Sequence, residues 1–158
     1  MRRVLEGSRY DLVLLKDEIE LVNGYLILQK LRFDNIFEFE VVVDDKLNLD
    51  LHKLPPMLSQ PFIENAVEHG MRSKLNGEGK ITVHYYLENS HIVVSIKDNG
   101  SGISTSQIGN KTHESMATLI TKERIENIKK IQNLNIEFDI LSKNRLGTTV
   151  KFKIPQKR

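Results

Sequence analysis

Asn65 and His69 stand one helical turn apart in the segment 60–70, QPFIENAVEHG. At about 100° per residue, one side of this helix is apolar and is expected to face the core. The residues on that side are Ser59, Phe62, Ile63, Ala66 and Val67. Asn65 and His69 lie within about 40° of each other on the remaining face. That face is either an ordinary solvated helix surface or part of a site, where the Asn65 amide oxygen could bind Mg²⁺ beside phosphates.

Asp98 ends the β-branched stretch HIVVSIKD, and Gly100 and Gly102 follow it. A carboxylate at a strand end can accept a hydrogen bond from an exocyclic amine such as that of adenine, and glycines let a ligand approach the backbone. Thr148, in the stretch GTTV, could offer a hydroxyl to an adenine nitrogen. Taken singly, the first motif is also explained by an ordinary turn, and GTTV by a turn that leads into a strand.

Hydrophobic spacing predicts the elements that hold these residues. A helix is expected over residues 14–33, a second from Pro56 to the His69-Gly70 pair, and a third with Thr121 as its N-cap. Alternating or β-branched patterns predict strands over 37–44, 80–88, 91–98, 135–141 and 147–154. The polar run 99–121 is expected to be a long, lid-like loop. This order predicts an α/β sandwich with helices on one face of a mixed sheet.

Composition narrows the class of protein. A chain of 158 residues with 39% hydrophobic and 28% charged residues is long enough for one cored domain. The net charge of +2 is no strongly cationic signal, and we expect no nucleic-acid partner. The absence of cysteine excludes disulfides, thiol catalysis and cysteine-bound zinc, and agrees with a reducing compartment. The apolar stretches are far shorter than the roughly 20 residues of a membrane span.

Three motifs together resemble a known family. LPPMLSQPFIENAVEHG, IKDNGSGI and GTTVKFKIP are similar to the N box, the G1 box and the final Gly-Thr motif of the GHKL nucleotide-binding fold. The first motif and the preceding LKDEIELVNGYLILQKLRF resemble the ATP-binding domain of LytS-like sensor histidine kinases, from about Leu15 to Pro155. The resemblance implies a Bergerat-type two-layer α/β sandwich with a mixed, mostly antiparallel sheet. Residues 1–34 would be a linker helix segment and residues 35–158 the ATP-binding catalytic domain, in a single domain overall.

The resemblance also implies roles for the candidate residues. Asn65 would hold Mg²⁺ against the phosphates of ATP, and His69 would face the ribose or the phosphates. Asp98 would bind the adenine amino group, and Thr148 would complete the contacts with the base.

Other positions would shape and close this site. Gly100, Gly102 and Ile103 would form the base pocket. A lid from about Ser104 to Thr121 would close over the triphosphate, with Arg124 as a candidate cation for it.

The implied function is the ATP-binding catalytic domain of a two-component sensor histidine kinase, donating the γ-phosphate of ATP to a histidine upstream. The relatives' PHFLFN-type phosphoacceptor motif does not occur here, so we do not expect this chain alone to phosphorylate itself. The implied partners are an upstream dimerisation and phosphoacceptor domain, a response regulator and, in the full-length protein, a second copy in a homodimer. We expect this chain to be a cytoplasmic domain. Relatives suggest that its parent protein is membrane-anchored.

Two alternatives remain. Many relatives carry a Gly-rich, GIGL-like box in the lid, whereas Met116, Ala117 and Thr118 stand there in this chain. A nucleotide-binding pseudokinase or scaffold module is therefore an alternative. ATPases of the gyrase and mismatch-repair kind place a glutamate one turn before the N-box asparagine to activate water. Pro61 occupies that position here, so such an ATPase is less favoured.

Overall fold

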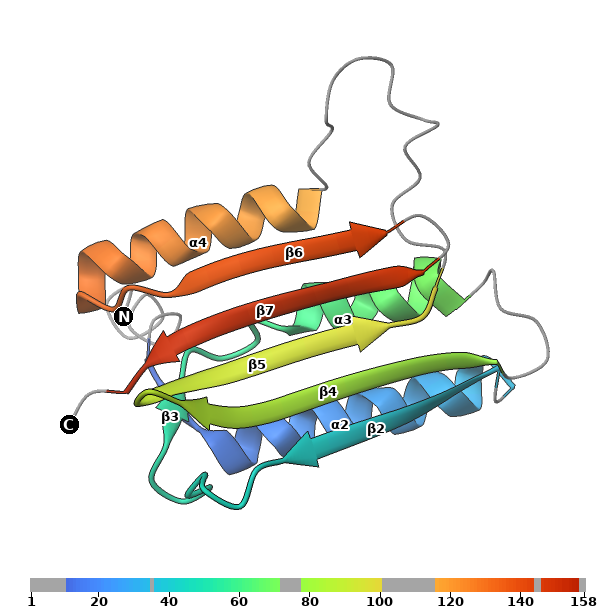
Figure 1. The fold of residues 1–158 in the computed structure, drawn as a ribbon, viewed down its shortest axis with the longest axis horizontal. Coiled ribbons are helices and arrows are strands. Elements are labelled where there is room, and N and C mark those ends of the chain that lie inside the picture. Colours follow the sequence, from blue (N-terminus) through green and yellow to red (C-terminus); the bar gives the residue numbers. More distant parts are fainter. Residues whose placement is uncertain (1–10, 35, 72–77, 101–115, 144–145, 157–158) are drawn as a thin grey trace, which may run out of the picture.

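Five strands form the main sheet of the structure, a computed structural model that describes residues 11–34, 36–71, 78–100, 116–143 and 146–156. Their order is β2-β4-β5-β7-β6, with β2 parallel to β4 and the other neighbours antiparallel (Figure 1). These strands are β2 (Phe37–Val43), β4 (Gly79–Glu88), β5 (His91–Asp98), β6 (Glu137–Lys143) and β7 (Gly147–Pro155). A smaller sheet, which was not predicted, pairs β1 (Val13–Leu14) with β3 (Lys53–Leu54).

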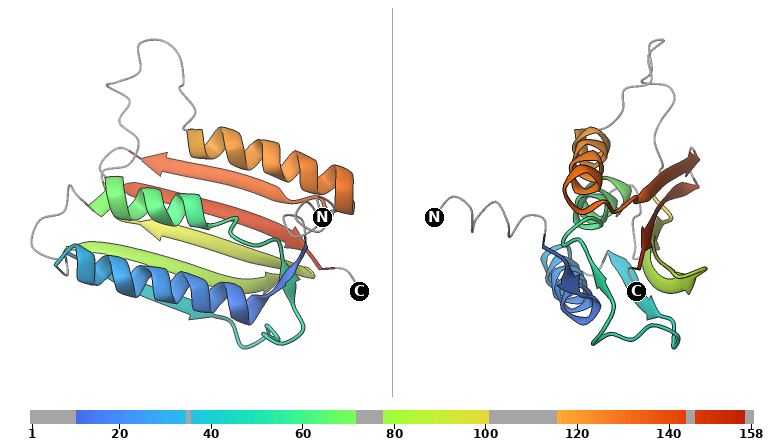
Figure 2. Two further views of the ribbon diagram at one scale, coloured as in Figure 1. Left: turned by 180° about the vertical axis from the view of Figure 1, so that it is seen from behind. Right: turned by 90° about the vertical axis from the view of Figure 1, so that its left-hand side faces the viewer.

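Helices cover one face of the main sheet, as the end-on view in Figure 2 shows. They are α2 (Leu15–Arg32), α3 (Gln60–Asn65) with its π-helical continuation η1 (Ala66–Gly70), and α4 (Met116–Gln132). The predicted α/β sandwich with a mixed, mostly antiparallel sheet is confirmed. The predicted β4–β5 hairpin is also confirmed, and its turn residues Asn89 and Ser90 have φ values of 48° and 63°.

Two predicted helix starts are wrong. Helix α3 begins at Gln60, with Pro61 in its first turn, instead of at Pro56. The reason is the backbone conformation of Met57, whose φ of 59° cannot belong to a right-handed helix. Helix α4 begins at Met116, so Thr121 is a buried residue within the helix and not its N-cap. The buried side chains of Thr118 and Thr121 stabilise the helix on the N-terminal side of the predicted cap, so it begins earlier in the chain than the local sequence signal indicates.

The long polar run is consequently shorter than predicted. Residues 116–121, which were expected to belong to the lid, are helical. The rest of the expected lid, together with Gly102 and Ile103, lies outside the described residues.

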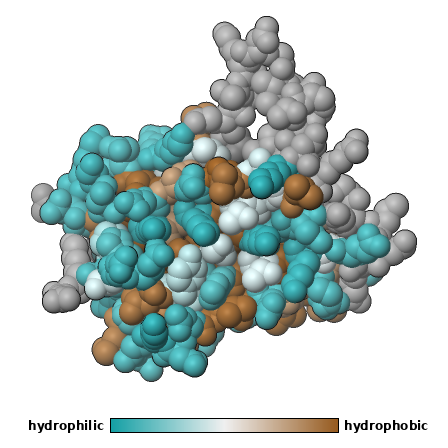
Figure 3. Space-filling view, viewed as in Figure 1, coloured by the Kyte–Doolittle hydropathy of each residue, from teal (hydrophilic) through white to brown (hydrophobic). Residues whose placement is uncertain are grey.

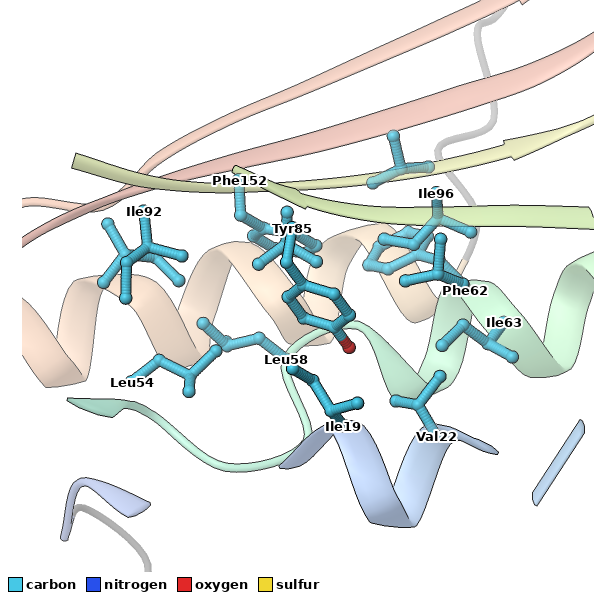
Figure 4. Close-up of a cluster of buried hydrophobic side chains, with 14 of the residues drawn as sticks. Ile19, Val22, Leu54, Leu58, Phe62, Ile63, Tyr85, Ile92, Ile96 and Phe152 are labelled. Atoms are coloured by element: carbon cyan, nitrogen blue, oxygen red, sulfur yellow. The ribbon is translucent and has the colours of Figure 1, made fainter. Parts of the chain in front are cut away.

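The hydrophobic core lies between the helices and the sheet. Alternate side chains of β4, β5 and β7 are buried there. They are Ile81, Val83, Tyr85, Ile92, Val94, Ile96, Val150, Phe152 and Ile154. Figure 4 shows Tyr85 pointing from β4 toward Ile19 and Val22 of α2. The predicted core side of α3 is confirmed, because Ser59, Phe62, Ile63, Ala66 and Val67 are all buried.

Phe62 anchors α3 beneath the sheet. Its ring centroid lies 5.4 Å from that of Phe138 on β6 and 5.8 Å from that of Phe152 on β7. Aromatic rings at these separations attract one another in addition to the apolar area that they bury. From this anchor, η1 runs toward the end of the sheet where β5 ends and β7 begins (Figures 1 and 2).

The opposite face of the sheet carries mostly hydrophilic side chains, with a few hydrophobic ones among them (Figure 3). The strands β2 and β6 form its two edges. The exposed alternate positions are Glu38 and Glu40 on β2, and Glu137, Asp139, Leu141 and Lys143 on β6, so all of them are charged except Leu141. Lys30 of α2 forms an ion pair with Glu38 at 2.7 Å.

Strand β7 starts directly against the end of β5, and this contact requires a glycine. Gly147 has a φ of 98°, in the left-handed region that side chains disfavour. A Cβ atom at this position would lie only 1.9 Å from the carbonyl oxygen of Asp98. The two strands can approach each other here only because Gly147 has no side chain.

We expect Gly147→Ala to lower the free energy of unfolding by at least about 2 kcal/mol, through backbone strain and the clash with Asp98. Urea titration followed by circular dichroism measures this change. Gly24→Ala is the matched control, since a Cβ at this exposed position within α2 meets nothing within 4 Å. The control should be as stable as the wild type or up to about 1 kcal/mol more stable. Equal stability of the two variants would contradict the prediction.

Candidate functional site

Three polar side chains share one row of the inner sheet face on β5, β7 and β6, and on β4 the same row continues with the buried Ile81. Asp98 ends β5, its register partner on β7 is Thr148, and the partner of Thr148 on β6 is Ser142. The preceding row on the same face is apolar and consists of Ile96, Val150 and Ile140. On β5, β7 and β6, the inner face therefore changes from apolar to polar within a single row.

The Asp98 carboxyl group is buried, with 8% of the residue exposed. Its Oδ1 accepts a hydrogen bond from the backbone N–H of Gly100 at 2.8 Å, and the backbone N–H of Thr148 also donates to the carboxylate. Burial raises the pKa of Asp98 above its ordinary value, and the two N–H groups oppose this effect in part. A carboxylate has about four acceptor positions, so the group can accept a further donor from a ligand.

Two neighbouring contacts hold the row in place. The Thr148 hydroxyl lies 3.1 Å from the Ser142 hydroxyl. Asn99 ties the end of β5 to the beginning of β4: its Oδ1 accepts the N–H of Lys80 at 2.7 Å, and its Nδ2 donates to the carbonyl of Glu78 at 2.9 Å. Sequence reasoning did not select Ser142, Asn99 or Gly147. A signal existed for Asn99 and Gly147, in the DNG and GTTV stretches, but none for Ser142.

Asn65 ends α3, at the junction with the π-helical turns of η1. It is partly buried, whereas its neighbours Glu64 and Glu68 are exposed. Short π-helical segments within helices occur frequently at functional sites. His69 belongs to η1, but its side chain lies outside the described part, and the predicted 40° separation from Asn65 assumed α-helical spacing that a π-helix does not have.

Arg124 of α4 contacts the chain just before α3. Its Nη2 donates a hydrogen bond to the carbonyl oxygen of Pro56. The suggested contact of Arg124 with a triphosphate stays a prediction. Within the described ranges, no helix is long and apolar enough to cross a membrane, and no three histidine, cysteine or acidic side chains form a group that could hold a metal ion.

The structure thus brings some predicted site residues together. Gly100 and Thr148 both contact Asp98 at the end of the sheet. Asn65 lies on the helix that runs toward the same end (Figures 1 and 2).

Comparison with known proteins agrees with this geometry. The family model for histidine kinase-, DNA gyrase B- and HSP90-like ATPases matches residues 57–158. The sensor protein LytS of Bacillus cereus is 27% identical over 97% of this chain, which spans 26% of the length of that protein.

Solved structures of histidine kinases share the fold. The catalytic domain of histidine kinase ThkA aligns with a TM-score of 0.60 and 17% identity, over 92% of this chain and 96% of that one. Full-length ShkA, solved in complex with AMPPNP, aligns with a TM-score of 0.65 and 12% identity, over 92% of this chain and 31% of that one. The chain therefore belongs to the family of histidine kinase-, DNA gyrase B- and HSP90-like ATPases, as the LytS-like ATP-binding catalytic domain of a sensor histidine kinase.

Proposed function

We propose that this chain binds ATP with Mg²⁺ at the polar end of the sheet and donates the γ-phosphoryl group to a histidine of an upstream dimerisation domain. In this proposal, the complete kinase is a homodimer that passes the phosphoryl group to a response regulator. It acts from a cytoplasmic position, within a parent that the LytS relatives suggest is membrane-anchored. The observation that carries the proposal is the buried, oriented Asp98 carboxylate beside Thr148.

Asp98 is suited to the base of the nucleotide. Gly100 and Thr148 orient its carboxylate with their backbone N–H groups, and the remaining acceptor positions can take the exocyclic amine of adenine. The Thr148 hydroxyl, already paired with that of Ser142, can donate to a ring nitrogen directly or through water. Gly100, Gly102 and Ile103 are proposed to shape the base pocket. Of these three, only Gly100 lies within the described residues.

Asn65 is suited to the phosphate end. One neutral amide oxygen fits Mg²⁺, which takes most of its remaining ligands from phosphates and water. When bound, Mg²⁺ neutralises charge that develops on the phosphates during transfer. The phosphoryl acceptor would be an imidazole nitrogen, which forms a bond to the γ-phosphorus as the bond to the β,γ-bridging oxygen breaks and ADP leaves with the electron pair. We propose that His69 donates to the phosphates or the ribose.

Phosphoryl transfer is favoured over hydrolysis by the residues around Asn65. Pro61, in the first turn of α3, replaces the glutamate that would activate water. Pro61 has no group that could act as a base for an attacking water, and Glu64 is exposed, with its Oε1 3.4 Å from the Nε2 of Gln60.

Asp98→Asn should abolish binding of the ATP analogue AMPPNP, because the amide replaces an acceptor oxygen with a donor and removes the charge. Calorimetric titration of the chain with AMPPNP and Mg²⁺ measures this loss. The control Asp139→Asn changes an exposed aspartate of β6 and should bind as the wild type does. Binding by Asp98→Asn with unchanged affinity would refute the assignment, and absence of binding by the wild type would favour the pseudokinase alternative.

Asn65→Ala should remove the enhancement of AMPPNP affinity by Mg²⁺ and leave the metal-free affinity within about twofold, because Asp98 still binds the base. Titrations with Mg²⁺ and with EDTA separate the two affinities. In a longer protein that includes the upstream phosphoacceptor histidine, the same substitution should abolish self-labelling by γ-³²P-ATP. Unchanged enhancement and unchanged labelling would exclude Asn65 as the metal ligand.

The stability of Asp98→Asn relative to the wild type should depend on pH. The folded-state pKa of Asp98 is raised, so this group stabilises the fold fully only below its unfolded pKa of about 3.9, and the contribution is lost as pH rises through the folded pKa. The variant should therefore gain stability relative to the wild type between pH 4 and pH 7, by about 1.4 kcal/mol for a tenfold difference in proton affinity between the folded and unfolded states. Urea unfolding at both pH values tests this, and a stability of the variant relative to the wild type that is unchanged or lower at pH 7 than at pH 4 would contradict it.

A further inference from the structure

A single peptide group before α3 is held from both ends by charged side chains. Arg124 of α4 donates to the carbonyl oxygen of Pro56, and Oε1 of Glu18 in α2 accepts the N–H of Met57 at 3.0 Å. Because this carbonyl and this N–H belong to the same peptide group, the cation lies at the negative end of its dipole and the carboxylate at the positive end.

Glu18 is an unusual residue to find in this position. It is 2% exposed, and its Oε2 is buried without a hydrogen-bond partner among the described residues. Burial raises the pKa of Glu18, while the Met57 N–H and the charge of Arg124 lower it in part. The Tyr85 side chain, which points from β4 toward α2 in Figure 4, is close enough to be affected by the Glu18 charge. A buried carboxylate is costly unless it is paired, so its contacts are expected to be specific.

The backbone at Met57 adds a second observation. Its φ of 59° lies in the left-handed region, which is uncommon for a residue with a side chain. Such a conformation persists where the surroundings hold it firmly. Met57 precedes the start of α3 by only three residues, and the intervening Leu58 and Ser59 are both buried. A shift of the held peptide would therefore be passed to α3.

We propose that Glu18 and Arg124 are positioning residues, which hold the Pro56–Met57 peptide between helices α2 and α4 and thereby set the position of Asn65 in the nucleotide site. This inference rests on the proposed nucleotide site. It gives Arg124 a different task from the phosphate contact suggested by sequence. It also links α4, which follows residues 101–115, to the helix that carries Asn65.

The test compares Glu18→Gln, Arg124→Met and the double variant in titrations with AMPPNP, with Mg²⁺ and with EDTA. Glu20→Gln on α2 and Lys130→Met on α4 are matched controls that make the same changes at exposed positions. Thermal unfolding curves identify a temperature at which every variant is fully folded. The titrations are carried out at that temperature, so that each affinity refers to folded protein. Each single variant should reduce the enhancement of AMPPNP affinity by Mg²⁺ at least fivefold. It should leave the affinity for metal-free AMPPNP within about twofold of the wild-type value. Either change releases the same peptide, so the double variant should lose no more than the larger single effect.

The outcomes separate the competing explanations. Direct phosphate binding by Arg124 would weaken AMPPNP binding in Arg124→Met alone and leave Glu18→Gln unaffected, and this would overturn the inference. A purely structural role would lower stability without changing the Mg²⁺ enhancement of the folded protein, which would also overturn it. Absence of AMPPNP binding by the wild type would refute the proposed function together with this inference, whereas unaltered enhancement in both variants refutes this inference alone.

Discussion

The packing of Phe62 against Phe138 and Phe152 is the contact on which the rest of the site depends. Asp98 and Thr148 belong to the sheet, whereas Asn65 belongs to a helix that, within the described residues, shares no backbone hydrogen bonds with β5 or β7. The separation between the two halves of the site therefore depends on side-chain packing between this helix and the sheet. Because the three rings pack against one another, a shift of α3 would open a cavity in the core. The aromatic cluster thus fixes α3 against the sheet, and with it the distance between the proposed base and phosphate contacts.

Much of the fold could be predicted from the sequence because its strands alternate clearly and its helices show apolar spacing. The hairpin at Asn89-Ser90 and the buried side of α3 are examples in which local pattern and final structure agree. The failures have a common origin in tertiary contacts. The start of α3 depends on the left-handed conformation of Met57, and the start of α4 depends on the burial of Thr118 and Thr121. Neither is visible in a window of neighbouring residues.

In the candidate site, the sequence predicts the residues proposed to face the ligand but not the residues that hold them in place. Asp98 and Thr148 could be selected because the flanking glycines and the resemblance to GHKL proteins mark them. Ser142, whose hydroxyl contacts that of Thr148, could not be selected. It is an ordinary serine within a strand, and its pairing with Thr148 follows from the register of β6 on β7. Arg124 is a different case. A cation after a lid-like segment suggests a phosphate contact, which stays a prediction, and the structure adds a contact that no local pattern indicates, with the Pro56 carbonyl 68 residues away in the sequence.

The charged edge strands have a consequence for how copies of this chain meet. An open sheet presents unpaired backbone groups along both edges, which could add strands from another molecule. On β2, the exposed alternate positions are the two acidic residues Glu38 and Glu40. Joining two sheets through their β2 edges would bring these like charges together. The pattern therefore protects the β2 edge from strand addition by a second copy.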